Sequence, residues 1–201
     1  MKLLLTAFEP FGGETVNAAW EAVNLLPDRL GALEIIKRTV PTEFVRSIET
    51  VTAAVEAVCP DAVLCVGQAG GRAALTPERI AVNLRDARIP DNGGFQPQDE
   101  PVVPGGPAAY FSTLPVKAMA QAIRAAGLPG EVSHTAGLYV CNNLMYGLLH
   151  FLAGTRRNIP GGFLHVPLTD AQAAAREKPT PGLPLEDIAR GLTAAISAIF
   201  P

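Results

Sequence analysis

Short apolar runs alternate with segments of helical periodicity along most of this chain, and this alternation limits the folds that it can adopt. The runs at 2–8, 33–40 and 62–67 read as strands, and the third, AVLCVG, is apolar on both faces like a central parallel strand. Runs at 133–140 and 161–167 predict two more strands. Alternating strands and helices predict an α/β fold, here a three-layer α/β/α sandwich with a mostly parallel, twisted central sheet.

Capping residues mark where several helices begin and end. Asn17 and Thr42 precede segments whose apolar residues recur at helical spacing, so we expect each to cap a helix. Gly127 is a stop signal after a third helical segment, and Pro184 opens a fourth as an allowed first-turn proline. The segment 76–107 is rich in Pro, Gly, Asp and Asn, and it predicts a short strand or hairpin followed by a long functional or mobile loop.

Length and charge exclude several classes of protein. A chain of 201 residues can bury a full core, and we expect residues 1–201 to form a single domain. The formal net charge is −3 without any run of Lys or Arg, so we expect no nucleic-acid partner. The apolar runs are too short to cross a bilayer, so we expect no membrane association. Glu9 and Pro10 end the first run early enough to favour a strand over a signal peptide.

The three cysteines, Cys59, Cys65 and Cys141, indicate neither a disulfide framework nor a metal site. Their number is odd, and no pair has the spacing of zinc ligands. We therefore expect no metal and a reducing, cytoplasmic location. Cys65 lies within an apolar strand and Cys59 stands beside Pro60 at a helix end, so both read as structural residues.

Cys141 lies where the run 133–140 meets the helical segment NNLMYGLLH. Sites in open α/β sheets form at the carboxyl ends of strands, and the positive end of a helix dipole favours a thiolate. The ordinary alternative is a buried, inert cysteine, and position alone does not decide between the two.

A thiol nucleophile needs a base, and the chain has three histidines. His150 lies several helical turns beyond Cys141, at about 1.5 Å per residue. His134 lies early in the strand predicted at 133–140, which places it at the opposite edge of the sheet at about 3.3 Å per residue. By elimination, we expect His165, at the end of the strand predicted at 161–167, to serve as the base.

His165 in turn needs a partner that fixes its tautomer. Glu78 and Asp91 are the candidates, and spacing does not choose between them. An acyl-transfer site also needs donors for an oxyanion, for which we consider the backbone N–H of Cys141 and the side chains of Arg88 and Gln68.

Phe8 and Phe11 stand outside the core spacing of any predicted strand or helix. They predict either a loop packed on the core or an apolar slot for a small flat group. We expect Tyr139 and Val140, just before Cys141, to form part of the wall of a pocket.

Six ordered blocks of the sequence resemble pyroglutamyl-peptidase I, the pyrrolidone-carboxylate peptidase family of cysteine peptidases. The resemblance extends over essentially the whole chain, and the blocks that carry it are AFEPFGGETVNAAW, VGQAGGR, TPERIAVNLRDARIPDN, GGPAAYFSTLP, TAGLYVCNNLMYGLLH and GGFLHVPL. The resemblance implies a cysteine exopeptidase that removes the N-terminal pyroglutamyl residue from peptides through a thioester. It also implies a cytosolic homotetramer that uses no metal or organic cofactor.

The resemblance also implies roles for residues. Cys141 is the nucleophile, His165 the base and Glu78 the partner of His165, which leaves Arg88 and Asp91 as supporting candidates. The residues that we then expect in the substrate pocket are Phe8, Phe11, Gln68, Tyr139 and Val140.

Two other functions remain as alternatives. The stretch VGQAGGR suits a phosphate, as in a phosphate-dependent nucleoside phosphorylase, although it lacks the Lys-Ser/Thr pair of a P-loop. That alternative leaves Cys141 and His165 unexplained. The second alternative is a non-catalytic module that binds a pyroglutamyl group or another small lactam.

Overall fold

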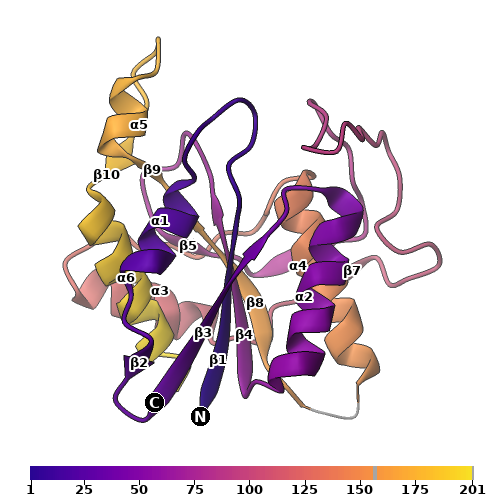
Figure 1. Cartoon of the computed structure of the whole chain (residues 1–201), viewed down its shortest axis with the longest axis horizontal. Helices are drawn as coiled ribbons and strands as arrows, with labels where there is room; N and C mark the ends of the chain where they lie inside the picture. The colour runs from indigo at the N-terminus through magenta and orange to yellow at the C-terminus, as the bar shows by residue number, and fades with distance from the viewer. Residues whose placement is uncertain (156–157, 201) are drawn as a thin grey trace.

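A computed structural model of the chain describes residues 1–155 and 158–200. Within these residues, a six-stranded sheet lies at the centre, in the order β2-β3-β1-β4-β8-β5 (Figure 1). The inner strands run parallel to one another, and the short edge strands β2 and β5 are antiparallel to their neighbours. The strands of this sheet are β1 (Lys2–Phe8), β2 (Arg29–Leu30), β3 (Leu33–Val40), β4 (Ala62–Gln68), β5 (Thr76–Pro77) and β8 (Gly161–Val166).

Helices cover both faces of the sheet, which confirms the three-layer α/β/α sandwich (Figure 1). One face carries α1 (Ala18–Leu25), α3 (Val116–Ala125) and α6 (Leu185–Ser197), and the other carries α2 (Phe44–Val58) and α4 (Val140–Gly154). The remaining elements are α5 (Asp170–Ala174), the pair β9 (Leu168–Thr169) with β10 (Gly182–Leu183), and the pair β6 (Ile80–Val82) with β7 (Ala109–Phe111). Among the described helices, none has both the length and the apolar character needed to cross a membrane.

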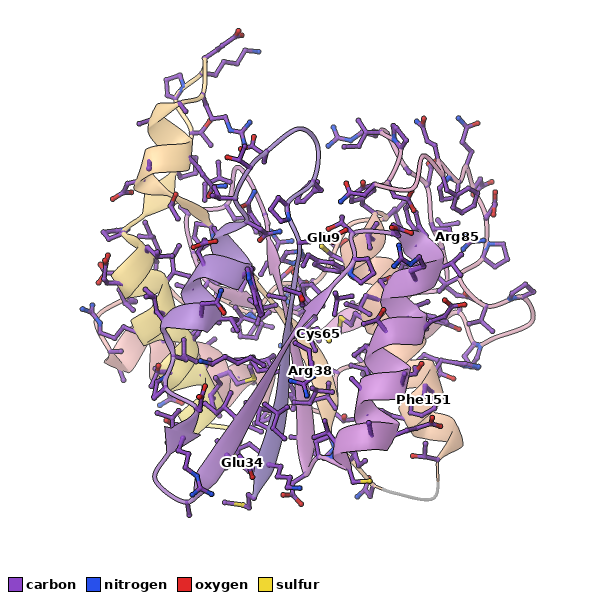
Figure 2. All side chains as sticks on the ribbon, in the orientation of Figure 1. Glu9, Glu34, Arg38, Cys65, Arg85 and Phe151 are labelled. Carbon is purple, nitrogen blue, oxygen red and sulfur yellow. The ribbon has the colours of Figure 1, made fainter. Side chains whose placement is uncertain are left out.

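The central strands form because their side chains fill two cores at once. Leu3 and Leu5 of β1 point into the core under α1, α3 and α6, whereas Leu4 points into the core under α2 and α4. This follows from the two-residue period of a strand. Cys65 of β4 is wholly buried in the second core and lies near the middle of the sheet in Figure 2, as expected for a structural cysteine.

The strand predicted at 133–140 does not form, and that prediction is wrong. Local bonds bend the chain instead: the Ser133 hydroxyl donates to the carbonyl of Thr135, and the Thr135 hydroxyl accepts the N–H of Gly137. Gly137 has a φ of +76°, which a strand does not allow. The backbone of Ser133 still bonds Pro77 and Arg79, but beyond it side-chain bonds of Ser and Thr take the place of the ladder that the apolar pattern suggested.

The N-terminus of α2 is capped from a distant segment and not by Thr42 as predicted. The Thr42 hydroxyl donates to the backbone carbonyl of Glu9, which ties it to the end of β1. The N–H of Phe44 at the start of α2 is taken by a carboxylate oxygen of Asp91, at 2.9 Å. The expected cap of α1 is confirmed, since the side chain of Asn17 accepts the N–H of Ala19.

Candidate active site

The carboxyl ends of β1, β4 and β8 meet at one edge of the sheet, at the top of Figure 1. In the parallel register of β4 and β8, Gly67 pairs with His165. The imidazole of His165 and the empty side-chain position of Gly67 therefore lie on the same face of the sheet. The loops that follow these strands and the N-terminus of α4 surround this edge. The sequence predicted this location for the site from the fold class alone.

His165 and Glu78 form a buried carboxylate–imidazole pair. The His165 Nδ1 atom lies 2.7 Å from Glu78 Oε1, and the two residues are only 3% and 0% exposed. Glu78 follows β5, whose neighbour in the sheet is β8, and its backbone N–H donates to the carbonyl of Phe163. The structure therefore brings Glu78, and not Asp91, to His165.

Arg72 completes the surroundings of this pair, and sequence reasoning missed it. Its Nη1 atom donates to Glu78 Oε1 at 2.6 Å and to the Thr76 hydroxyl at 2.6 Å. Its Nη2 atom donates to the backbone carbonyl of Thr135 at 2.8 Å. The available signal was the need of a buried carboxylate for a cation, with an arginine six residues before Glu78.

Cys141 occupies space that the missing side chain of Gly67 leaves free. A Cβ atom at position 67 would lie 3.1 Å from Cys141 Sγ and 2.7 Å from the Phe163 ring. Because Gly67 is in register with His165, the thiol lies beside the imidazole on the same face of the sheet. The Phe163 ring also packs against the imidazole, with ring centroids 4.8 Å apart.

The other two histidines lie elsewhere. The Nδ1 atom of His150, on α4, is 2.9 Å from the Tyr110 hydroxyl. His134 is exposed on the bent segment before α4. The exclusion of His134 by its place in a strand is wrong, because no strand forms there, but His165 is the histidine that the structure places beside Cys141.

The thiol of Cys141 is neutral in the unliganded chain. Burial, and after it the nearby Glu78 carboxylate, raises the pKa of Cys141 to about 12, although Arg72 and the backbone N–H of Cys141 act in the opposite direction. The start of α4 favours the thiolate as expected, but removal from water has the larger effect on the pKa of Cys141 and acts in the opposite direction.

The protonation states of Glu78 and His165 allow the pair to accept a proton. Burial lowers the pKa of His165 below its ordinary value, although the hydrogen bond and charge of Glu78 oppose this shift. Burial alone would raise the pKa of Glu78, but His165, Ser133 and Arg72 together lower it. A neutral imidazole held by an ionised carboxylate thus lies beside a neutral thiol, an arrangement suited to general-base activation of a nucleophile.

Two asparagines fix the start of α4. The Asn142 side chain accepts the N–H of Val82 and donates to the carbonyls of Val82 and Leu84, which attaches the β6 segment to the helix. The Asn143 side chain donates to the carbonyl of Phe44 in α2 at 2.6 Å. These bonds hold Cys141, which stands immediately before them, in a fixed place.

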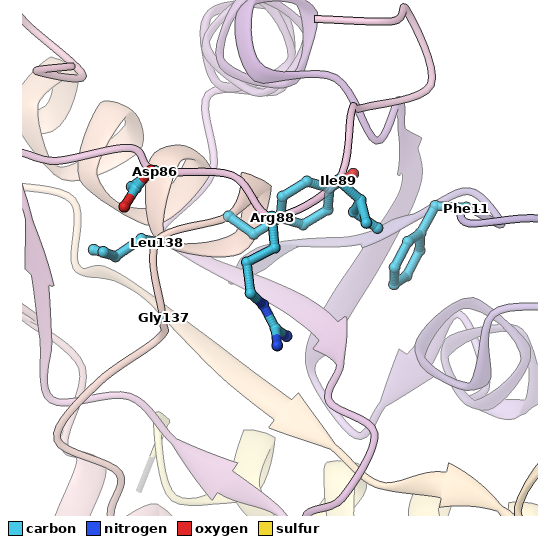
Figure 3. A pocket seen from close by; sticks show the side chains of 7 residues that line it. Phe11, Asp86, Arg88, Ile89, Gly137 and Leu138 are labelled. Carbon is cyan, nitrogen blue, oxygen red and sulfur yellow. The ribbon is translucent and has the colours of Figure 1, made fainter. Parts of the chain in front are cut away.

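A pocket of about 730 Å³ opens at the N-terminus of α4, and Tyr139 lines it two residues before Cys141. In Figure 3, the Arg88 side chain extends into the open space and the Phe11 ring faces the same space from the opposite side. The residues that line the pocket are Phe11, Asp86, Arg88, Ile89, Gly137, Leu138 and Tyr139. The predictions for Phe11, Tyr139 and Arg88 thus converge on one cavity.

Three other residues expected in the pocket lie outside its lining. Phe8 ends β1 and is 2% exposed in the core beside Phe163, so its placement in a loop is wrong. Val140 is wholly buried as the first residue of α4. The Gln68 side-chain oxygen accepts the N–H of Ala18, at the start of α1, which makes it a helix cap.

Asp91 has a structural position. Besides the N–H of Phe44, its carboxylate accepts the N–H groups of Gly93 and Phe95, so it shapes its own loop as well as capping α2. The Tyr139 hydroxyl donates to the carbonyl of Pro90, one residue before Asp91. Asp91 therefore supports the pocket wall and makes no contact with His165.

Cys59 and Cys65 differ from Cys141 in their surroundings. Cys59 is an exposed, free thiol at the C-terminus of α2, and Cys65 is free and buried in β4. Burial raises the pKa of Cys65 to about 12. In the part of the chain that the structure describes, no three His, Cys, Asp or Glu side chains are grouped so as to hold a metal ion.

Comparisons with known proteins agree on one family. The family model described as pyroglutamyl peptidase matches residues 1–201. The pyrrolidone-carboxylate peptidase of Levilactobacillus brevis is 56% identical over 199 residues, which cover 99% of this chain and 97% of the relative. That of Erwinia tasmaniensis is 52% identical over 197 residues, with coverage of 98% and 91%.

Solved structures show the same similarity. The crystal structure of pyroglutamyl peptidase I from Bacillus amyloliquefaciens matches with a TM-score of 0.94 at 46% identity, covering 98% of this chain and 96% of that one. A mutant pyrrolidone carboxyl peptidase from the hyperthermophile Pyrococcus furiosus matches with a TM-score of 0.94 at 40% identity, covering 99% and 98%.

The geometry predicts how His165 titrates. Because burial lowers the pKa of His165, we expect its imidazole to titrate below about 6.5, the ordinary value for histidine. In Glu78→Gln the midpoint should fall further, because the charge that favours the imidazolium is removed. NMR of the ring nitrogens, with the signal assigned by its absence in His165→Asn, measures both values. An unchanged or higher midpoint in Glu78→Gln would show that Glu78 does not act on His165.

Proposed function

The chain belongs to the pyroglutamyl peptidase family, and we propose that Cys141, His165 and Glu78 carry out its reaction, the removal of an N-terminal pyroglutamyl residue from peptides. The observation that supports these roles best is the 2.7 Å pair of His165 and Glu78 beside the thiol of Cys141. We also propose that residues 1–201 act as one catalytic domain.

The reaction proceeds in two acyl-transfer steps. His165 takes the proton of the Cys141 thiol as Sγ attacks the carbonyl carbon of the pyroglutamyl residue. The imidazolium then protonates the leaving amine, the C–N bond breaks, and a thioester remains. A water molecule, deprotonated by His165, attacks the thioester and releases pyroglutamate and the neutral thiol. Glu78 holds the imidazole in the required tautomer and stabilises the imidazolium at each step.

We propose two groups as donors to the oxyanion that forms in both steps. The backbone N–H of Cys141 lies in the first turn of α4, where N–H groups have no partner within the helix and the helix dipole favours negative charge. The Arg88 guanidinium extends into the adjoining pocket. Both donors suit charge that develops on the former carbonyl oxygen.

The pocket suits a flat, uncharged ring. Phe11 and Tyr139 offer aromatic surface, with ring centroids 6.1 Å apart, and Ile89 and Leu138 add apolar surface. A pyroglutamyl residue carries no ammonium group, so it can bind in this pocket without any charged group losing its hydrating water. An ordinary N-terminal amine would lose that hydration at a cost of several kcal/mol, and Arg88 would repel it.

The two alternative functions gain no support. The stretch proposed to hold phosphate contains Arg72, whose guanidinium is bonded to Glu78, Thr76 and Thr135. The relatives, matched over nearly their full length, are named as peptidases. A peptidase reaction gives Cys141 and His165 a role, whereas a phosphorylase or a binding module would leave both residues without one.

We propose a cytoplasmic location and a homotetrameric assembly as the remaining parts of this function. The free, exposed thiol of Cys59 fits a reducing compartment. The tetramer rests on the family resemblance. Light scattering coupled to gel filtration should give a mass near four times that of the 21.1 kDa chain, and a mass of one or two chains would contradict the tetramer.

Replacement of the thiol tests the central role. Cys141→Ser should lower kcat/KM for release of a chromophore from a pyroglutamyl amide on the order of 10³-fold or more, because a neutral hydroxyl is a far weaker nucleophile. Cys65→Ala and Cys59→Ser are the matched controls and should keep activity near that of the parent chain. Full activity in Cys141→Ser, or a requirement for phosphate, would overturn the proposal.

Gly67 gives a second test, of the placement of the thiol. In Gly67→Ala the new Cβ atom would meet both Cys141 Sγ and the Phe163 ring, so we expect the thiol to shift and kcat/KM to fall on the order of 10²-fold. Gly70→Ala, in the loop directly after β4, is the control, since its Cβ would find its nearest neighbour, Leu168, at 3.8 Å. Equal activity of the two variants would mean that the thiol does not depend on this space.

A further inference from the structure

One guanidinium connects three separate segments behind the catalytic pair. Arg72, in the loop after β4, bonds the carboxylate of Glu78, the hydroxyl of Thr76 and the carbonyl of Thr135. It shares Glu78 Oε1 with the imidazole of His165, so the same oxygen accepts two donors. Its side chain is 27% exposed, whereas that of Glu78 is fully buried.

We propose that Arg72 is a positioning residue for the Glu78–His165 pair, and that its positive charge sets the pH range in which the pair can accept a proton. This inference rests on the proposed function, in which His165 takes and returns a proton in each step. Arg72 acts through Glu78 and does not touch the substrate.

The physical argument concerns the proton affinity of the groups around the guanidinium. A positive charge disfavours the protonated form of every nearby acid or base. Accordingly, Arg72 acts to lower the pKa of Cys141, of His165 and of Glu78. Without it, the pair as a unit would hold its proton to higher pH, whichever of its two members carries that proton. The thiol would also ionise less readily.

The remaining charged groups around the pair do not replace Arg72. Glu131 lines a surface hollow of about 370 Å³ together with Arg72, and its negative charge acts in the opposite sense. His134, on the same segment, is exposed. Arg79 follows Glu78 in the sequence but lines a different hollow, with Phe111 and Lys117.

A purely structural clamp is the competing explanation, because Arg72 also holds the segment before α4. Arg124 provides the matched control. Its Nη1 atom donates to the carbonyl of Gly130, in the same segment, at 2.7 Å, and it has no bond to the Glu78–His165 pair. Arg124→Gln therefore removes a clamp from this segment and leaves the charge at the pair unchanged.

The decisive measurement is kcat/KM as a function of pH with a pyroglutamyl amide that carries no titrating group, so that both limbs of the profile belong to the free enzyme. In Arg72→Gln both limbs should move to higher pH by about 0.5 to 1 unit. Arg72→Lys keeps the charge, and its limbs should stay in place even if kcat falls. Arg124→Gln should also leave the limbs in place.

A second readout does not depend on turnover. The rate at which iodoacetamide alkylates Cys141 at pH 8 should fall roughly 3- to 10-fold in Arg72→Gln, because the thiolate fraction falls by that factor for a shift of about 0.5 to 1 unit. Peptide mapping by mass spectrometry separates this rate from that of Cys59. The exposed Cys59 is an internal control in every sample, and its rate should not change.

The outcomes separate the two ideas. If pyroglutamyl amides are not hydrolysed but alkylation of Cys141 slows in Arg72→Gln, the proposed function fails and the role of Arg72 stands. If both limbs of the pH profile and the alkylation rate of Cys141 are unchanged in Arg72→Gln, the proposal is overturned and Arg72 has only a structural role. If Arg72→Gln does not fold, Arg72→Lys decides: limbs in place support the proposal, and a rise of more than about 0.5 unit with the charge retained overturns it.

Discussion

A carboxylate removed from water needs compensating partners, and the partners of Glu78 organise the site of this protein. Glu78 is wholly buried, and a buried charge without a partner costs several kcal/mol. His165 from β8 and Arg72 from the loop after β4 both bond its Oε1 atom. Through Arg72 the same network reaches the carbonyl of Thr135, before α4. One buried charge therefore joins segments that are far apart in the sequence, and it fixes the imidazole beside the thiol.

Burial also decides how the thiol becomes reactive. Cys141 lies in the first turn of α4, yet its pKa is raised because removal from water outweighs the helix dipole. Cys141 is therefore not a thiolate before a substrate binds. The site holds a neutral thiol next to a neutral imidazole, and in the reaction that we propose the thiol loses its proton during attack. The empty side-chain position of Gly67 leaves room for the thiol, and the bonds of Asn142 and Asn143 fix the start of the helix that carries it.

Local sequence patterns predicted most of the fold correctly and failed where a distant partner was involved. The inner strands and the main helices follow from apolar periodicity, which is a local property. Thr42 looked like a helix cap, but Asp91 caps α2 from a segment about fifty residues further along the chain. The apolar run at 133–140 resembled a strand, yet bonds of Ser133 and Thr135 bent it. Phe8 was interpreted as a loop residue with Phe11, although the predicted strand at 2–8 already included it and β1 ends there.

The sequence by itself determined the α/β class and the edge of the sheet where the site lies, because both depend on periodicity and strand direction, which are encoded locally. It offered Cys141 and His165 as candidates, and the family resemblance, not their position along an element, assigned their roles. Only the tertiary structure decided between Glu78 and Asp91 on physical grounds, and only it revealed Arg72 beside the pair. It also decided the ionisation of the thiol, because burial and the charge of neighbouring side chains depend on residues that folding brings together.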